Sequence, residues 1–448
     1  MNLDILDKSY DIRWIFPTDM DEEFYYKIWF AFATLNVEAQ NFAIWYDARL
    51  SSEALKEALV RWICDAGKNV VDIGLCSTDM VYFASWIYDD VDIGLMITAS
   101  HNPKEYNWLK CCSKDAVPIN MKIFGKDIKD FIERWVFTPS EIVWKVASRD
   151  VTDDFVDHII SFVDPQNIKP FKLVADAGNW TAWVFMEKLS QKLGLELIKL
   201  YFEPDWDFPN HHPSPIEKEN VEDLIAKVLE VWADLWVAFD WDADRMYICD
   251  EEGVIWSWTI TTAMISKMLL ERNPWKKVLY NAVCWNIVPQ TIEENGWIWL
   301  ISKVWHVYLK EIMKRDEDII FGWEHSGHYY FTKNWNADSW VIAFAVVLEL
   351  LSLSGKKASE SRKGFEKFHS IEETNTKVKS VPDKLAELKE IYKDWTQDEF
   401  DWLTVRYADF WFNVRPSSNE PLLRLNVEAV SEVLLAEKSR ELLDIIRR

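Results

Sequence analysis

A hydroxyl and an imidazole stand next to each other at Ser100 and His101, in the run Ile97-Thr98-Ala99-Ser100-His101-Asn102-Pro103. The apolar segment from 92 to 97 predicts a buried strand in front of them. Pro103 then ends regular structure, because the residue before a proline avoids helical geometry. A hydroxyl beside a base on a loop can act as a nucleophile. The alternative is an unreactive Ser/His turn, which the local spacing alone does not exclude.

Three carboxylates alternate along Phe239-Asp240-Trp241-Asp242-Ala243-Asp244-Arg245. In an extended segment, residues two apart project to the same side, so Asp240, Asp242 and Asp244 can converge on one point. Three oxygen ligands with no Cys or His suit Mg²⁺, completed by phosphate oxygen or water. The apolar segment 235–239 in front of the run favours a metal site over an acidic surface turn.

Two further polar stretches interrupt apolar surroundings. Glu324, Ser326 and His328 fall within 322–328, and Arg415 opens the loop Arg415-Pro416-Ser417-Ser418-Asn419-Glu420-Pro421. Carboxylate and hydroxyl groups can hydrogen-bond to sugar hydroxyls. A guanidinium with the backbone N–H groups of a tight loop can bind a phosphate.

Taken in this order, the four stretches resemble those of the α-D-phosphohexomutases, most closely the phosphomannomutase/phosphoglucomutase branch. The resemblance extends from Tyr10-Asp11-Ile12-Arg13 to Arg424-Leu-Asn-Val-Glu428, nearly the whole chain. It implies an α/β fold: three similar mixed α/β domains plus a C-terminal α+β domain around a central active-site cleft. The expected domains are 1–145 with the phosphoserine loop, 146–250 with the metal-binding loop, 251–365 with the sugar-binding loop, and 366–448 for phosphate binding.

The resemblance also implies an activity, the interconversion of hexose 1-phosphate and hexose 6-phosphate with mannose, glucose or both as the hexose. Ser100 would carry the phosphoryl group as phosphoserine, and hexose 1,6-bisphosphate would be both intermediate and activator. Mg²⁺ would be held by Ser100, Asp240, Asp242 and Asp244. The implied catalytic residues are Ser100, His101, Lys110 and Arg13. The implied substrate contacts are Tyr10, Arg245, His306, Glu324, Ser326, His328, Arg415, Ser417, Ser418 and Asn419.

Several alternatives stay open at this point. Phosphoglucosamine mutase is the nearest competing activity, and His325 favours the hexose branch over it. Lys110 can act as a base only if its surroundings lower its pKa, and is otherwise an ordinary surface lysine. Arg49 is either a surface charge or a phosphate contact. A non-catalytic phosphosugar-binding relative is the other alternative function if the tryptophans are genuine, because indole rings at Trp108, Trp241 and Trp323 would crowd the site.

Composition excludes other classes of partner. A net charge of −24 repels nucleic acid and anionic membranes, although phosphosugars must then be attracted by local Arg and Lys groups. The six cysteines show no C-x-x-C spacing, so reduced thiols in a cytoplasmic protein are expected. The N-terminus lacks a signal-peptide pattern, and the longest apolar run, 341–353, is too short to span a bilayer and contains Glu349.

The elements that must position these residues follow an alternating pattern. Strand and helix signals alternate from 42 to 100, with Ser52 as the expected N-cap of a helix from Glu53. Helical spacing also covers 152–160, and strand patterns cover 172–176 and 235–239. The polar, basic stretch from Ser354 predicts a linker. His211 and His212 are adjacent and cannot readily chelate one ion, so a loop role is favoured over a metal site.

Tryptophan is unusually abundant in this chain. There are 27 Trp and 12 Gly, where glycine alone usually makes up about 7% of a protein. Glycine is expected where the motifs of the related proteins need positive φ or close backbone approach, and an indole satisfies neither. The positions concerned are Trp14, Trp45, Trp108, Trp180, Trp183, Trp241, Trp323 and Trp411. The sequence therefore predicts that the source lineage reads UGA as glycine and that the printed sequence translates it as tryptophan.

Overall fold

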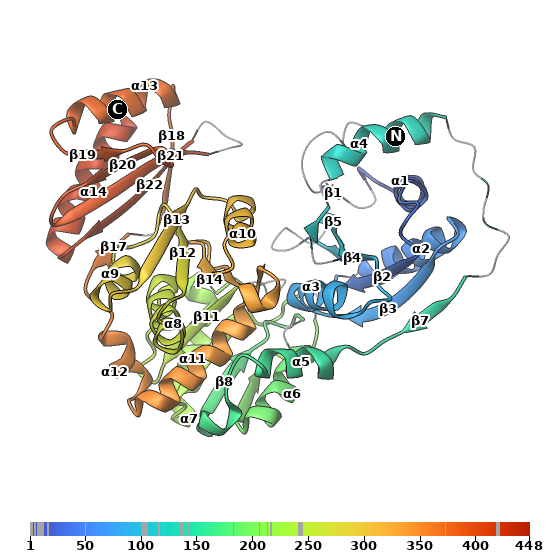
Figure 1. Ribbon diagram of the computed structural model, residues 1–448, viewed down its shortest axis with the longest axis horizontal. Coiled ribbons are helices and arrows are strands. Elements are labelled where there is room, and N and C mark those ends of the chain that lie inside the picture. Colours follow the sequence, from blue (N-terminus) through green and yellow to red (C-terminus); the bar gives the residue numbers. More distant parts are fainter. Residues whose placement is uncertain are drawn as a thin grey trace. The chain divides into compact units, whose positions relative to one another are not determined.

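The fold is that of a computed structural model of the chain (Figure 1). It describes residues 3, 6, 13–15, 18–49, 51–99, 106–114, 117–119, 121–134, 138, 140, 144–181, 183–205, 207–212, 214–215, 217–240, 245–371, 373–417 and 422–448. For Arg13, Val117, Pro118, residues 121–123, Lys218 and His306 it describes the backbone only. The chain divides into two units, Met1–Ile255 with Ala337–Gly355, and Trp256–Asn336 with Lys356–Arg448.

The first sheet of unit 1 runs in the order β1-β5-β4-β2-β3-β7, with β6 paired to β5. β2 is parallel to β3 and β4, whereas β5 turns back antiparallel to β4. Its elements are β1 (Arg13–Ile15), α1 (Glu22–Leu35), β2 (Asn41–Tyr46), α2 (Ser52–Asp65), β3 (Asn69–Leu75), α3 (Thr78–Ile87), β4 (Ile93–Thr98), β5 (Tyr106–Ser113), β6 (Val117–Pro118), α4 (Met121–Glu133) and β7 (Val146–Ser148). β4 is buried at every residue, which explains why it is apolar without alternation.

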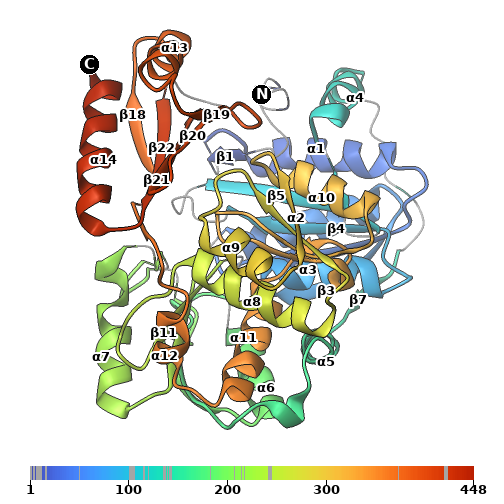
Figure 2. The same ribbon diagram turned by 60° about the vertical axis from the view of Figure 1, so that its left-hand side comes forward.

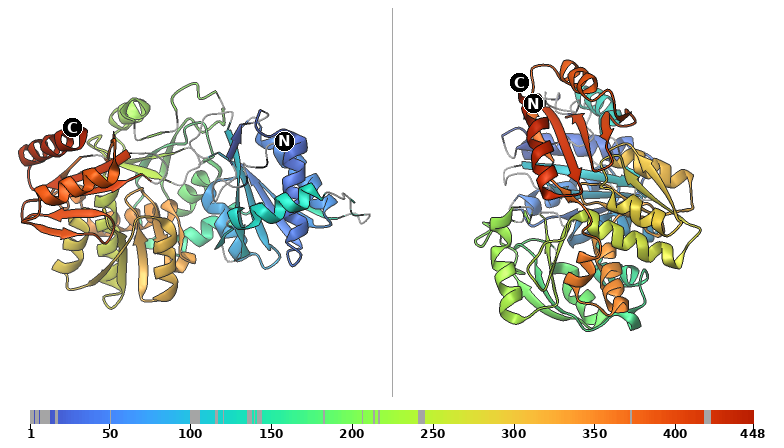
Figure 3. Two further views of the ribbon diagram at one scale, coloured as in Figure 1. Left: turned by 90° about the horizontal axis from the view of Figure 1, so that it is seen from above. Right: turned by 90° about the vertical axis from the view of Figure 1, so that its left-hand side faces the viewer.

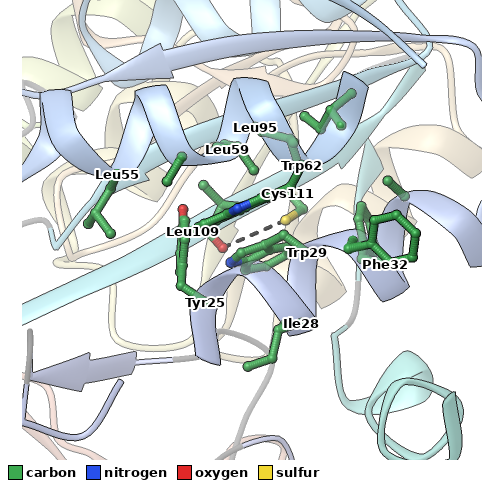
Figure 4. Close-up of a cluster of buried hydrophobic side chains, with 14 of the residues drawn as sticks. Tyr25, Ile28, Trp29, Phe32, Leu55, Leu59, Trp62, Leu95, Leu109 and Cys111 are labelled. Atoms are coloured by element: carbon green, nitrogen blue, oxygen red, sulfur yellow. Dashed lines mark hydrogen bonds between the residues drawn. The ribbon is translucent and has the colours of Figure 1, made fainter. Parts of the chain in front are cut away.

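A hydrophobic core lies between this sheet and helices α1 and α2 (Figure 4). The Tyr25 and Trp62 rings, from α1 and α2, lie 4.5 Å apart edge to face. Leu95 and Leu109 face them from β4 and β5. Alternate strand residues point to opposite faces, so the other face of these strands is left for α3.

The second sheet of unit 1 repeats the pattern of parallel strands followed by one antiparallel strand. Its order is β11-β10-β8-β9, with β8 parallel to both β9 and β10 and β11 antiparallel to β10. The elements are α5 (Thr152–Ile160), η3 (Pro165–Asn167), β8 (Lys172–Asp176), α6 (Trp183–Leu193), β9 (Glu196–Leu200), η4 (Lys218–Val221), α7 (Glu222–Val231), β10 (Leu235–Phe239) and β11 (Met246–Asp250). The segments predicted for α5, β8 and β10 are confirmed at their exact bounds.

Helix α11 (Trp340–Ser354), preceded by β16 (Ala337–Asp338), joins unit 1 from a distant part of the sequence. It is apolar nearly all round because it is buried: Trp340 packs 4.3 Å from the Phe239 ring. Its one acid, Glu349, accepts hydrogen bonds from Asp164 N at 3.2 Å and Asn167 Nδ2 at 3.1 Å. Within the ranges given above, no helix has the length and apolarity needed to cross a membrane.

Unit 2 contains the third sheet, whose strands run β13-β12-β14-β15. β12 is parallel to β13 and β14, and β15 returns antiparallel to β14. The elements are α8 (Trp258–Arg272), β12 (Lys277–Asn281), α9 (Ile287–Glu294), β13 (Ile298–Ser302), α10 (His306–Arg315), β14 (Ile319–Trp323), β15 (Tyr329–Phe331), η5 (Thr332–Asn334) and α12 (Ala358–Lys363).

The fourth sheet is antiparallel throughout, in the order β17-β22-β21-β20-β19 with β18 also paired to β22. Figures 2 and 3 show α14 lying along this sheet, where its Leu442 and Ile446 enter the core. The elements are β17 (His369–Ser370), β18 (Thr374–Lys377), α13 (Val381–Ile391), β19 (Thr396–Asp398), β20 (Leu403–Arg406), β21 (Phe410–Pro416), β22 (Leu422–Ala429) and α14 (Glu432–Arg447). Three mixed sheets with their helices, and a C-terminal antiparallel sheet with its helices, thus confirm the predicted fold class of three α/β domains and one α+β domain.

Two local predictions were wrong. α2 begins at Ser52 itself, after the N-cap Ser51, and the Ser52 hydroxyl donates to Asp47 Oδ1 at 2.6 Å instead of capping the helix. The stretch predicted as a linker after Ser354 contains helix α12, which buries Ala358 and Arg362. Ser52 thus uses its hydroxyl on Asp47, and α12 is a short helix with buried residues despite its polar, basic composition.

Several tryptophans adopt a backbone that glycine prefers. φ is +56° at Trp232, +53° at Trp335, +64° at Trp402 and +134° at Trp305. A left-handed conformation costs an L-residue with a Cβ about 1–2 kcal/mol. Trp232 is 87% exposed, so no packing of its ring offsets that cost.

Other tryptophans are buried with an unsatisfied indole N–H. Such a donor costs about 1–3 kcal/mol, against a total stability of about 5–15 kcal/mol for a protein. Across the part of the chain that the structure describes, no group accepts from Nε1 of Trp14, Trp29, Trp45, Trp62, Trp183, Trp236 or Trp323. Trp411 differs, because its Nε1 donates to Glu428 Oε1 at 2.7 Å.

Candidate active site

All four candidate motifs occupy equivalent places, the turns of antiparallel hairpins. They connect β4 to β5, β10 to β11, β14 to β15 and β21 to β22. In the first three sheets, the hairpin begins at a largely buried parallel strand, so an apolar strand leads into a polar loop each time. Tyr10, Ser100, His101, Asp242, Asp244, Ser418 and Asn419 lie outside the described residues.

The strands around the Ser100 loop place Arg13 beside it by register. Arg13 of β1 lies opposite Trp108 of β5, which lies opposite Thr98 of β4, two residues before Ser100. Only the backbone of Arg13 is described.

Lys110 lies on the face of the first sheet that α3 covers. Its Nζ donates to Thr78 Oγ1 at 3.5 Å, and it lies opposite Met96 in the register. The Met96 sulfur lies 3.6 Å from the same hydroxyl. Lys110 is half-buried and two residues along β5 from Trp108, so it is not the freely solvated surface lysine of the alternative interpretation.

Arg49 is buried, which excludes the surface-charge interpretation. Its Nε donates to Asp47 Oδ2 at 3.1 Å, and both side chains are completely buried. Nη1 donates to the carbonyl of Tyr106 at 3.3 Å, directly after the Ser100 loop. A buried charge requires such partners, so Arg49 serves to fix the end of this loop.

Asp240 and Arg245 close the base of the acidic loop. Arg245 Nε donates to Asp240 Oδ2 at 2.7 Å and Arg245 N donates to Oδ1 at 3.0 Å. No group of three His, Cys, Asp or Glu residues suited to a metal occurs among the residues described, which do not include Asp242 and Asp244. Carboxylate oxygens are the hard ligands that Mg²⁺ prefers, so the residue types at Asp240, Asp242 and Asp244 fit this ion in their chemistry.

Glu324 is held at the start of a tight turn in unit 2. Its Oε2 accepts from the Tyr330 hydroxyl at 2.7 Å, and both side chains are buried. Glu324 N donates to the carbonyl of His328 at 3.1 Å. Gly327 has a φ of +87°, and a Cβ there would lie 2.8 Å from the Trp258 ring, so this turn requires glycine.

Ser326 and His328 lie on the same turn and contact each other, with 2.9 Å between Ser326 Oγ and His328 Nδ1. His306 is the first residue of α10, directly after Trp305 with its φ of +134°, and only its backbone is described. Ser326, His328 and Glu324 are therefore together, as expected from their spacing.

Arg415 belongs to a charged cluster that sequence reasoning missed. Its Nη2 donates to Glu373 Oε2 at 2.8 Å and lies 3.5 Å from His325 Nε2. Arg424 Nη1 donates to the other Glu373 oxygen at 2.9 Å, and Asn426 Nδ2 donates to Oε2 at 3.1 Å. Ser417 N donates to the carbonyl of Leu422 at 2.9 Å, closing the turn that begins at Arg415.

The cluster keeps Glu373 ionised. Burial opposes its charge, but the hydrogen bond from His325 and the positive charge of Arg415 hold the pKa of Glu373 well below its usual range. His325 is itself oriented by Asn281, whose Nδ2 lies 3.3 Å from His325 Nδ1. No local pattern around Glu373 signalled this role.

Comparison with known proteins gives matches over nearly the whole chain. Four phosphoglucomutase/phosphomannomutase models match: alpha/beta/alpha domain I at 4–138, domain II at 153–253, domain III at 259–368 and the C-terminal domain at 373–445. A phosphomannomutase from Vibrio cholerae is 33% identical over 460 residues, with 98% of each chain covered.

Solved structures agree with these matches. A phosphoglucomutase/phosphomannomutase family protein from Burkholderia thailandensis is 27% identical with a TM-score of 0.85, covering 99% of this chain and 97% of that one. An N-acetylphosphoglucosamine mutase from Aspergillus fumigatus, crystallised with GlcNAc-6P and magnesium, shares the fold at 13% identity and a TM-score of 0.57, covering 91% of this chain and 83% of that one. The motif-based expectation is confirmed: this chain belongs to the phosphoglucomutase/phosphomannomutase family of phosphohexose mutases.

Proposed function

We propose that this chain interconverts hexose 1-phosphate and hexose 6-phosphate, with mannose, glucose or both as the hexose, through a phosphoserine at Ser100. The observation that carries the proposal is the family match over all four domains, together with a candidate motif at the same hairpin turn of each sheet. A hexose 1,6-bisphosphate is the intermediate, and added bisphosphate is the activator.

Asp240, Asp242 and Asp244, with the phosphate on Ser100, are the proposed Mg²⁺ ligands. Mg²⁺ would neutralise charge on the transferred phosphoryl group, the main requirement of phosphoryl transfer. Arg245, fixed to Asp240 by two hydrogen bonds, adds a guanidinium next to these carboxylates. It is proposed to contact the substrate.

The proton is handled by His101 and Lys110 in this proposal. The sugar hydroxyl that accepts the phosphoryl group must lose a proton, and a positioned base can take it. Lys110 lies on β5, the strand that follows the Ser100 loop, and its Nζ donates to the Thr78 hydroxyl. Arg13 and Tyr10 are proposed to contact the phosphate at this end.

Recognition of the hexose is assigned to the turn of Glu324, Ser326 and His328, with His306 as a further contact. The Tyr330 hydroxyl fixes one oxygen of Glu324, which leaves the carboxylate able to accept from sugar hydroxyls. The phosphate that is not transferred is assigned to Arg415, Ser417, Ser418 and Asn419. Because these residues bind whichever phosphate is not being transferred, the bisphosphate can turn over and present either phosphate to Ser100.

The division into domains and the location are also part of the proposal. Domains at 1–145, 146–250, 251–365 and 366–448 are supported by the four matched ranges. A cytoplasmic location is supported by six free cysteines, five of them buried.

A coupled assay tests the function. Purified enzyme with Mg²⁺ and a hexose bisphosphate is expected to convert glucose 1-phosphate or mannose 1-phosphate, and glucosamine 1-phosphate more slowly than either. Ser100→Ala is expected to lose turnover while keeping the fold, whereas Ser148→Ala, at an exposed serine of β7, keeps activity. Near-normal turnover by Ser100→Ala would reject the phosphoserine mechanism, and a clear preference for glucosamine 1-phosphate would reject the hexose assignment.

A further inference from the structure

Arg415 and Arg424 are a like-charged pair across two strands. They lie directly opposite each other in the antiparallel register of β21 and β22. Side chains at opposed positions are neighbours, and like charges there repel each other. An anion between the two arginines would offset this repulsion.

Glu373 is that anion. One carboxylate oxygen accepts from Arg415 Nη2 at 2.8 Å and Nε at 3.3 Å, and the other accepts from Arg424 Nη1 at 2.9 Å. Glu373 immediately precedes β18, whose Thr374 lies opposite Leu425 of β22. The edge strand therefore brings the carboxylate to the two guanidinium groups, where it is 16% exposed.

A largely buried carboxylate next to a phosphate-binding arginine repels phosphate, so its presence there needs an explanation. We propose that Glu373 is a positioning residue, which holds Arg415 and Arg424 as a pair directed at the phosphate that is not transferred. This inference rests on the proposed function of the Arg415 loop. The two guanidinium groups outweigh the charge of Glu373 itself, so these three side chains together keep a net positive charge that attracts an anion.

Kinetics of Glu373→Gln, Arg415→Ala and the double variant test the proposal. Glu373→Gln keeps the shape of the side chain but loses its charge. We expect the KM of this variant for glucose 1-phosphate to rise about tenfold with little change in kcat, because a residue group that binds the phosphate acts in ground and transition states alike. The double variant should lose less than the sum of the two single effects, since Glu373 acts partly through Arg415. Glu441→Gln is the control, because Glu441 accepts from Lys438 of α14 and from Tyr392, the residue directly after α13, and the KM of this variant should not change.

Additive effects in the double variant, or a loss confined to kcat, would overturn the proposal. If Glu373→Gln does not fold, Glu373→Asp keeps the charge at a shorter reach, and its KM should rise less than that of Arg415→Ala. Calorimetric binding of glucose 6-phosphate separates this test from the proposed function. An enzyme without turnover that still loses affinity on Glu373→Gln would reject the mutase activity but support the cluster, and unchanged affinity would reject the cluster.

A second inference is carried independently by the backbone. Trp232 ends α7 with φ +56° and ψ +49°, and Trp335 ends η5 with φ +53° and ψ +34°. Helices end in this left-handed conformation most often at glycine. Trp305 has φ +134° and ψ +132°, close to a region that is essentially restricted to glycine.

The buried tryptophans point to the same conclusion through a different property. Over the described ranges, the indole N–H groups of Trp45, Trp62 and Trp236 have no acceptor, although each residue is almost completely buried. Native interiors rarely contain so many unsatisfied donors. We infer that the tryptophan positions named in this paragraph and the preceding one are glycine in the expressed protein, because UGA codons are read as glycine.

Gene sequence and native mass test this inference. We expect UGA codons at Trp232, Trp305 and Trp335, and a native mass clearly below the 53.0 kDa of the printed sequence. Tandem mass spectrometry of native peptides should find glycine at these positions. UGG codons there, or a native mass of 53.0 kDa, would overturn it.

Discussion

Arg245 and Asp240 are joined by two hydrogen bonds at the base of the acidic loop. The guanidinium of Arg245 donates to one carboxylate oxygen of Asp240, and the backbone N–H of Arg245 donates to the other. The loop between them therefore starts and ends at one fixed point. A carboxylate held in this way can present a constant geometry to a cation.

Asp240→Asn tests this relationship. The amide keeps one acceptor for Arg245 but loses the negative charge that attracts Mg²⁺. Activity at fixed Mg²⁺ should fall at least about tenfold, and the Mg²⁺ concentration for half-maximal activity should rise. Removal of metal by a chelator should abolish activity in the unmodified protein.

The control is Asp234→Asn, at the other end of β10. Asp234 is exposed, and its side chain accepts from Lys172 N at 2.8 Å. Its metal titration should match that of the unmodified protein. A titration that is unchanged in Asp240→Asn would remove this carboxylate from the metal site.

The Arg49–Asp47 pair gives a prediction about stability. Both side chains are completely buried, so Arg49→Met leaves Asp47 charged without its partner. Such a change typically costs about 3–5 kcal/mol, whereas an exposed ion pair contributes about 0–1 kcal/mol. Arg149→Met, which breaks the exposed pair with Asp90, is therefore the matched comparison. Urea unfolding that shows equal losses in the two variants would contradict the buried-pair interpretation.

His211 links stability to pH through Asp176. Its Nε2 lies 2.8 Å from Asp176 Oδ2 in a largely buried pair. Burial opposes protonation, but the hydrogen bond and charge of Asp176 raise the pKa of His211 above its usual value of 6.5.

The sign of the effect follows from linkage. A histidine pKa that is higher in the folded state contributes stability fully below about 6.5, and this contribution is lost as the pH rises through the folded value. The free energy of unfolding should therefore decrease as the pH rises above about 6.5, and His211→Asn should flatten that decrease. A pH dependence that is identical in the two proteins would contradict the role of this pair.

Much of the fold could be predicted from local patterns. Strands β8 and β10 are short apolar runs between turn signals, so their bounds follow from the sequence alone. The strand before the acidic run also fixes where Asp240 must lie. Family motifs then identified the hairpin turns that carry the candidate site.

The supporting residues could not be predicted because their partners are distant in sequence. Glu373 contacts Arg415 and Arg424, 42 and 51 residues later, through the pairing of β18 with β22. The sequence allows two interpretations of Arg49. Its role depends on the carbonyl of Tyr106, 57 residues later, which accepts its hydrogen bond. Charged residues acquire such roles from tertiary contacts, which leave no periodic signal in the sequence.

Trp232→Gly tests the backbone argument in protein made from a synthetic gene with the printed sequence. Trp232 is 87% exposed at the left-handed end of α7, so removing its ring loses little packing and relieves the backbone. We expect stabilisation of about 1–2 kcal/mol in urea unfolding, although glycine also raises the entropy of the unfolded chain. Trp275→Gly is the control, because Trp275 is 68% exposed but is not among the residues with positive φ. That variant should be neutral or destabilised, since glycine there relieves no strain. Equal effects of the two substitutions would show that loss of an exposed indole, and not the backbone conformation, decides the outcome.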